Sequence, residues 1–209
     1  GFGGALKNIG MGCGSRAGKM EQHNSGKPAV NADKCRVCHY CAKQCAHSAI
    51  SFETGRAQID HSKCVGCGRC IGTCPFHAIH PTVSSANDDL CRKMAEYSKA
   101  VVDGRPSFHI SIAADISPYC DCHGENDAPV LPNLGMFASF DPVAIDQACA
   151  DMCNAAAPMP GSILGEMSRY DPARDDAFTA ISPDTDWHVT LEHAEKIGLG
   201  TRVYTLIRV

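Results

Sequence analysis

Eight of the fourteen cysteines in this 209-residue chain stand in two runs of identical spacing. Each run reads C-x2-C-x2-C-x3-C; the first is Cys35, Cys38, Cys41 and Cys45, and the second is Cys64, Cys67, Cys70 and Cys74. Thiolates are soft ligands that suit zinc and iron–sulfur centres. This spacing is typical of [4Fe–4S] cluster ligands. Zinc is the alternative, since four cysteines also form structural zinc sites.

The two runs belong to an internal repeat. A shift of 29 residues lays Lys34 on Lys63, Ala49 on Ala78 and Ile50 on Ile79. Residues 30–80 resemble a two-cluster bacterial ferredoxin, in which the fourth cysteine of each run ligates the other cluster. We expect that cysteine to start a short helix. The resemblance implies two [4Fe–4S] clusters, one on Cys35, Cys38, Cys41 and Cys74, the other on Cys64, Cys67, Cys70 and Cys45.

The repeat departs from the ferredoxin pattern at one position. Ala46 follows the first run where such runs usually carry proline, whereas Pro75 follows the second. The change removes no ligand. Between the runs, the apolar pieces 50–52 and 57–59 flank Gly55 and predict a β-hairpin.

Composition excludes several classes of protein. The net charge is −4, and basic residues form no stripe with interleaved aromatics, so we expect no nucleic-acid partner. No apolar stretch reaches the length of a membrane span. A core-forming chain with 44% apolar residues does not need a disulfide scaffold. We therefore expect a reducing, cytoplasmic setting, in an organism or niche low in oxygen.

The elements around the repeat alternate between helix and strand. Helices are predicted from Asn87 to about 101, from Asp141 to about 156 and over 187–197, each with cap residues at one or both ends. Strands are predicted over 108–114, 130–140 and 202–209, and 158–186 is mostly loop. The pattern predicts a layered α/β domain, with α+β as the alternative. The predicted parts are 1–27 and 83–209 of this domain and a cluster module over 28–82.

The other six cysteines divide into three groups. Cys149 and Cys153 lie four apart on the apolar stripe of the helix that Asp141 begins, which favours core packing over metal binding. Cys91 carries the same expectation. Cys13 lies in a glycine-rich segment. Two interpretations stay open for it: an ordinary cysteine of a flexible loop, or a reactive thiol.

A second candidate site follows the strand 108–114. Cys120, Cys122 and His123 provide two thiols and an imidazole, which suit a metal or a redox step. Asp115 and Asp141 each follow a predicted strand, and ligands gather at the carboxyl ends of strands in open α/β sheets. We expect these five residues to gather around a pocket; the alternative is a loop held by its own hydrogen bonds.

The segments outside the repeat are similar to the iron–sulfur centre proteins of domain-of-unknown-function family 362. The similarity lies in 1–12 (GFGGALKNIGMG), 15–19, 115–123, 126–129, 141–148 and 197–200. It implies an α/β domain interrupted by a two-cluster module. Family members carry a long segment before the match to Gly1, so we expect the α/β domain to be incomplete. An exposed apolar face or sheet edge would then be covered by another chain or by the missing segment. The glycine-rich start is also weighed as an anion cradle.

Three functions remain open at this point. The first is electron transfer through two [4Fe–4S] clusters to a redox partner protein. The second is an oxidoreductase with a substrate or metal site at Cys120, Cys122 and His123. In the third, the clusters are structural or sense oxygen.

Overall fold

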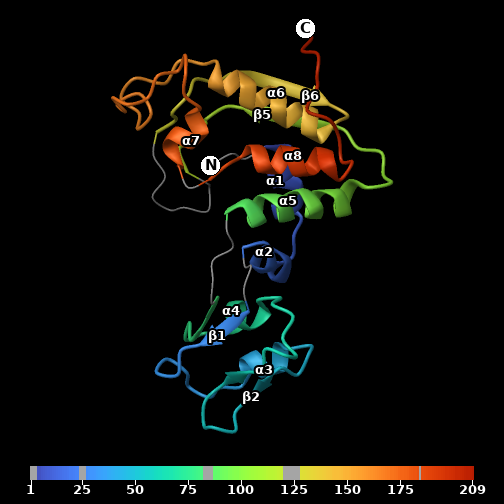
Figure 1. The fold of residues 1–209 in the computed structure, drawn as a ribbon, viewed down its shortest axis with the longest axis vertical. Helices are drawn as coiled ribbons and strands as arrows, with labels where there is room; N and C mark the ends of the chain where they lie inside the picture. The colour runs from blue at the N-terminus through green and yellow to red at the C-terminus, as the bar shows by residue number, and fades with distance from the viewer. Residues whose placement is uncertain (1–3, 24–26, 82–86, 120–127, 184) are drawn as a thin grey trace. The chain divides into compact units, whose positions relative to one another are not determined.

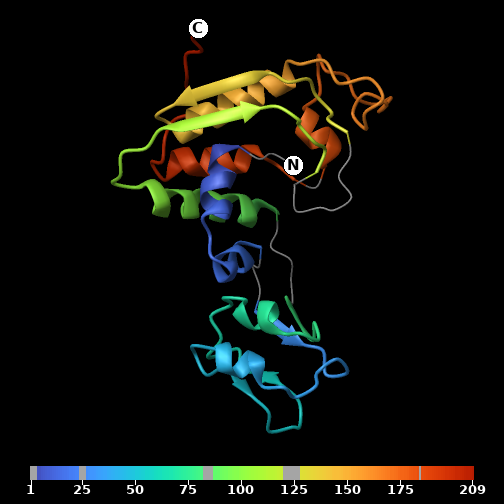
Figure 2. The same ribbon diagram turned by 180° about the vertical axis from the view of Figure 1, so that it is seen from behind.

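The computed structural model describes residues 4–23, 27–81, 87–119, 128–183 and 185–209. The chain divides into two compact units, drawn from opposite sides in Figures 1 and 2. The α/β unit comprises Gly1–Cys13 and Cys91–Val209, and the cysteine unit comprises Gly14–Leu90. The predicted cluster module, 28–82, lies within the cysteine unit. Across the described ranges, no helix is both long and apolar enough to cross a membrane.

The α/β unit is built on a two-stranded antiparallel sheet. Strand β5 (His109–Ala113) pairs with β6 (Gly135–Ser139), with His109 opposite Ser139 and Ala113 opposite Gly135. The helices are α1 (Ala5–Lys7), its continuation η1 (Asn8–Gly12), α5 (Asn87–Val102), α6 (Pro142–Asn154), α7 (Ala177–Ile181) and α8 (His188–Lys196). Helix α6 contacts both strands as well as α1 and α8. The mixed α/β class is therefore confirmed.

The core of this unit lies between its helices. Leu6 of α1, Val143 of α6 and Leu191 of α8 are completely buried against one another. Helix α6 begins where the sequence predicts, because an Asp141 carboxylate oxygen accepts the N–H groups of Val143 (2.8 Å) and Ala144 (3.0 Å). Helices α5 and α8 also form close to their predicted bounds.

One face of the sheet is exposed and apolar. Alternate side chains of a strand point to opposite faces, and on β5 the face with His109 is turned toward α6 while Ile110 and Ile112 are 59% and 72% exposed. Met136 and Phe140 are 70% and 79% exposed. The apolar face expected from the sequence is present.

Several predicted elements differ from the structure. Only 135–139 of the predicted strand 130–140 is strand, as Pro132 interrupts its start. Residues 202–209 form no strand, although their composition favours one. Helix α7 lies within the predicted loop 158–186. Propensity alone did not decide these segments, because a strand also needs a paired neighbour.

The cysteine unit consists of α2 (Arg16–Gln22) and the short elements of the repeat, which form two equivalent halves. The first half contains β1 (Pro28–Val30), α3 (Tyr40–Gln44) and β2 (Ile50–Ser51), and the second contains β3 (Gln58–Ile59), α4 (Arg69–Thr73) and β4 (Ile79–Pro81). Strand β1 pairs with β4, and β2 pairs with β3 as the predicted hairpin. Each pair joins one half of the 29-residue repeat to the other.

Backbone contacts repeat with the same period. Asn31 N–H donates to the Ala78 carbonyl at 2.7 Å, and the equivalent Asp60 N–H donates to the Ala49 carbonyl at 2.8 Å. His39 and Gly68 begin α3 and α4 with φ of 63° and 68°. The halves are thus related by an approximate two-fold, and each completes the other.

Candidate metal centres

The eight cysteines of the repeat line two separate cavities. The first cavity is lined by Cys35, Cys38, Cys41 and Cys74. The second is lined by Cys45, Cys64, Cys67 and Cys70. Each cavity takes three thiols from one run and the fourth from the other run.

The fold explains why the fourth cysteine crosses over. Cys45 and Cys74 lie directly after α3 and α4, in extended conformation, so the chain leaves the helix toward the other half. They end these helices, contrary to the expectation that they start them. The strand that follows then pairs with the opposite half, which carries each thiol away from its own run.

Backbone N–H groups point at the cysteine sulfurs. Ala49 N–H lies 3.4 Å from Cys45 Sγ, and the equivalent Ala78 N–H lies 3.3 Å from Cys74 Sγ. Gly66 N–H lies 3.4 Å from Cys64 Sγ, and Ala57 N–H lies 3.5 Å from Cys35 Sγ. Such donors stabilise negative charge on sulfur, as metal-bound thiolates require.

Burial and mutual repulsion act against this charge in the metal-free chain. Burial, followed by the Cys64 and Cys67 thiols, raises the pKa of Cys70 to about 12. Burial likewise raises the pKa of Cys41, with smaller contributions from Cys38 and Cys74 of the same cavity. Ionised together, these thiols need a cationic centre, so metal binding would release protons.

Each cavity brings together four thiols, the ligand number of a [4Fe–4S] centre. Within the part of the chain that the structure describes, no three His, Cys, Asp or Glu side chains converge closely enough to hold a single metal ion. Zinc also takes four cysteine ligands. The three cysteines at two-residue spacing and the fourth thiol taken from the other run favour the [4Fe–4S] centre, since two-cluster ferredoxins use this arrangement.

The second predicted site is not assembled as expected. Asp115 follows the carboxyl end of β5, whereas Asp141 follows that of β6. Because these strands are antiparallel, the two carboxylates lie at opposite ends of the sheet, and Asp141 lies by His109 instead. Grouping Asp115 with Asp141 was wrong, since sequence does not reveal strand direction. Cys120, Cys122 and His123 lie outside the described residues.

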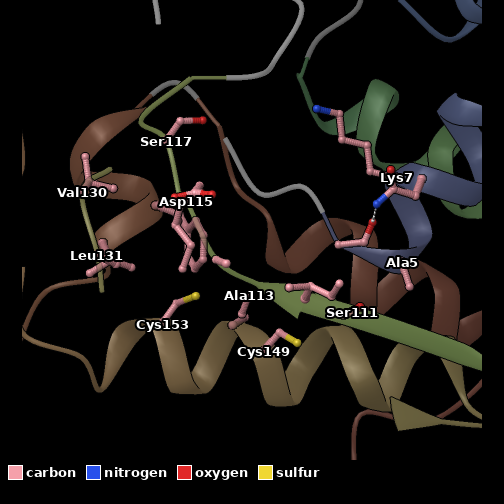
Figure 3. A pocket seen from close by; sticks show the side chains of 18 of the residues that line it. Ala5, Lys7, Ser111, Ala113, Asp115, Ser117, Val130, Leu131, Cys149 and Cys153 are labelled. Atoms are coloured by element: carbon pink, nitrogen blue, oxygen red, sulfur yellow. Dashed lines mark hydrogen bonds between the residues drawn. The ribbon is translucent and has the colours of Figure 1, made fainter. Parts of the chain in front are cut away.

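A cavity of about 730 Å³ lies beside β5 in the α/β unit (Figure 3). Its lining includes Lys7, Ser111 and Asp115, and Cys149 and Cys153 point toward it from α6. Burial raises the pKa of these two thiols to about 12 and about 11, so both are neutral. Their predicted burial is confirmed.

The remaining cysteines also agree with the sequence analysis. Cys91 is buried on α5, and its thiol donates to the Asp186 carbonyl at 3.6 Å. Cys13 is exposed.

One buried carboxylate was not predicted from the sequence. Asp146 of α6 is completely buried and accepts the N–H groups of Ala5 (2.5 Å) and Leu6 (2.9 Å). Burial raises its pKa to about 7, although both N–H groups lower it. A Cβ on Gly4 would meet this carboxylate at 2.2 Å, so the glycine is required. The helix start weighed as an anion cradle therefore holds a carboxylate of the chain itself. The sequence signal that could have indicated this burial is an acidic residue among the apolar residues of the predicted helix.

Comparison with known proteins identifies one family and several partial relatives. The family described as "Domain of unknown function (DUF362)" matches residues 1–151. Over 90 residues the chain is 30% identical to Putative oxidoreductase UacF of Escherichia coli (strain K12), which covers 42% of this chain and 14% of that protein.

Two further relatives match over shorter stretches. A subunit of the ion-translocating oxidoreductase complex of Methanosarcina acetivorans is 41% identical over 59 residues, 27% of this chain and 22% of that protein. Indolepyruvate oxidoreductase subunit IorA of Methanothermobacter thermautotrophicus is 40% identical over 57 residues, 27% of this chain and 9% of that protein. The chain spans less than a quarter of each of these three relatives.

Proposed function

The chain belongs to the DUF362 family, and from that premise we propose that it is an iron–sulfur electron-transfer protein with one [4Fe–4S] cluster in each four-thiol cavity. The observation that carries the proposal is the division of eight cysteines between two cavities. Each cavity is lined by the first three cysteines of one run and the fourth cysteine of the other run. When bound, such clusters accept and donate single electrons. The named relatives are oxidoreductases, which supports a redox role.

The protein's own residues would hold, insulate and connect the two centres. The thiols of Cys41 and Cys70, one from each cavity, interact electrostatically, so the two sets are neighbours. Ala57, Ala78 and Ile79 are buried around the first cavity and exclude water from it. This arrangement supports passage of an electron from one cavity to the other.

A redox partner protein would approach where apolar side chains near the thiols are exposed. Tyr40 is 53% exposed. Val65, directly after Cys64, and Phe76, two residues after Cys74, are also exposed. Val65 lines the second cavity and Phe76 the first. The relative named as part of a complex supports a partner for this chain too.

A second candidate, a redox enzyme, rests on the cavity of about 730 Å³ in the α/β unit. Its size is typical of small-molecule sites, and Lys7, Ser111 and Asp115 supply polar groups to its wall. An Asp115→Asn variant separates the candidates. Under electron transfer alone, cluster reduction and reoxidation by an artificial acceptor are unchanged and no added substrate is turned over. A substrate whose turnover falls in the variant would favour the enzyme.

The main test is to remove ligands one at a time. Anaerobically purified protein should contain about eight iron and eight sulfide, four of each per cluster. Cys35→Ala and Cys74→Ala should leave the same residual electron paramagnetic resonance (EPR) spectrum, and Cys45→Ala and Cys64→Ala should leave the other. Cys13→Ala, which removes an exposed thiol outside both cavities, is the matched control. A shared residual spectrum for Cys35→Ala and Cys45→Ala would refute crossed ligation, and zinc in place of iron would refute the function.

A further inference from the structure

The two cavities occupy equivalent places in the repeat, so their linings can be compared position by position. Under the 29-residue shift, the lining residues Ile50, Ala49 and Val65 of the second cavity correspond to Ile79, Ala78 and Arg36 of the first. The N–H···S contacts of Cys45 and Cys74 also correspond. A backbone contact to a ligand sulfur that is present on one side alone would distinguish the cavities directly.

One such contact is the hydrogen bond from Ala57 N–H to Cys35 Sγ, at 3.5 Å. The position equivalent to Ala57 is Pro28, which lines the second cavity as Ala57 lines the first. Proline has no N–H group. Cys64, the counterpart of Cys35, therefore cannot receive this bond.

Equivalent basic residues hold both segments in place. Arg56 Nε donates to the Ala32 carbonyl at 3.1 Å, three residues before Cys35. Its counterpart Lys27 donates through Nζ to the His61 carbonyl, three residues before Cys64. The same contact to the preceding loop is thus present on the two sides. Proline in place of alanine removes the N–H donor but leaves this contact in place.

The charged residues nearby do not create an opposite bias. Each cavity is lined by one arginine, Arg36 in the first and Arg69 in the second. Each preceding loop carries one carboxylate, Asp33 or Asp60. The walls also differ in side chains, with His39 and Phe76 of the first cavity at the positions of Gly68 and His47. The Ala57 N–H group is a difference that contacts a ligand sulfur directly.

A donor to a ligand sulfur favours the more negative, reduced state of a cluster, and such bonds are among the factors that set its reduction potential. Resting on the proposed function, we propose that the two clusters have unequal midpoint potentials, with the cluster in the first cavity higher because Ala57 donates to Cys35 and Pro28 cannot donate to Cys64. Electrons entering at the second cavity then pass to the first.

Burial acts in the opposite sense at Cys35 and Cys41, since a low dielectric disfavours added charge. The Ala57 N–H group favours that charge at Cys35 by direct contact with its sulfur, and Pro28 offers no such group to Cys64.

A pair of reciprocal substitutions tests the inference in the full, cluster-loaded chain. Pro28→Ala supplies the missing donor and should raise the potential of the second cluster, shifting its one-electron equilibrium on the order of tenfold, or about 59 mV. Ala57→Pro should lower the potential of the first cluster by a similar amount. Ala57→Gly keeps the N–H group and is the matched control. Midpoints come from redox titration followed by EPR, with signals assigned from the Cys74→Ala and Cys45→Ala variants.

The outcomes separate the inference from the function on which it rests. A protein without two [4Fe–4S] clusters overturns both. Two clusters with equal midpoints, a higher midpoint in the second cavity, or a Pro28→Ala variant with unchanged potentials overturns the inference alone. Pro28→Ala keeps the test decisive even when Ala57→Pro fails to fold. Unchanged iron content and absorbance in Pro28→Ala show that a shifted midpoint is not caused by a damaged site.

Discussion

The two units of this chain keep their shape in different ways. In the cysteine unit, each half of the repeat closes on the other, and thiols form part of the buried core beside small residues. In the α/β unit, helices α1, α5, α6 and α8 bury an apolar core and one face of the sheet stays exposed. Under the proposed function the first arrangement depends on the clusters that the thiols hold, whereas the second depends on packing and on one buried carboxylate.

Removing the clusters should give the largest difference between the units. Cys35 and Cys41 are core residues, and the helices of the repeat, α3 and α4, have only five residues each. Helices this short are not stable without their tertiary contacts. Chelation under oxidising conditions should therefore abolish hydrogen-exchange protection over 28–81 and preserve it in α6 and α8. Simultaneous loss in both units would contradict the comparison.

The next largest effect is expected at Asp146. Asp146→Ala leaves two buried N–H groups, of Ala5 and Leu6, without an acceptor, at about 1–3 kcal/mol each. The α/β unit should unfold at lower denaturant concentration, while the cluster absorbance of the intact chain is unchanged before unfolding. Asp151→Ala, at an exposed position on the same helix, is the control: it removes hydrogen bonds from Gln147 and Tyr204 that water can replace, and should cost no more than about 1 kcal/mol. Equal losses in both variants would show that the buried carboxylate has no special role.

The same residue should make stability depend on pH. The Asp146 pKa is raised from 3.8 to about 7, so between these values the native state binds more protons than the unfolded state. Its contribution to the free energy of unfolding therefore falls as pH rises through this window and is constant above it. Asp146→Asn removes the titration, so the free energy of unfolding of the native protein, relative to that of the variant, should rise as pH falls from about 7 toward 4. Denaturant unfolding at pH 4.5, 6 and 7.5 measures this; a pH-independent difference would contradict it.

Local signals in the sequence predicted the parts that depend on neighbours along the chain. These parts are the two four-cysteine runs, the hairpin around Gly55 and the helix cap at Asp141. In each, the contacts join residues a few positions apart or residues of the same repeat. The bounds of α5, α6 and α8 followed from apolar periodicity and caps. The hairpin predicted over 50–52 and 57–59 is present as β2 and β3, whereas the pairing of β1 with β4 was not predicted.

Long-range arrangement accounts for the misses. Asp115 and Asp141 were placed together because sequence does not reveal that β5 and β6 run in opposite directions. Asp146 was passed over because its partners, Ala5 and Leu6, lie about 140 residues away. Residues 202–209 have strand composition but no strand partner among the described residues.

The smallest effect is expected on the exposed face of the sheet. Ile112 is 72% exposed, so Ile112→Lys should change the free energy of unfolding by no more than about 0.5 kcal/mol. It should also reduce self-association, because contiguous apolar surface promotes it. The neighbouring Ser111 lies on the opposite face, in the wall of the cavity and in hydrogen-bond contact with Cys149. Ser111→Lys forces a charge toward α6 and should be clearly destabilising. Denaturant unfolding with light scattering measures both; equal destabilisation by the two variants would mean that Ile112 is not on a free surface.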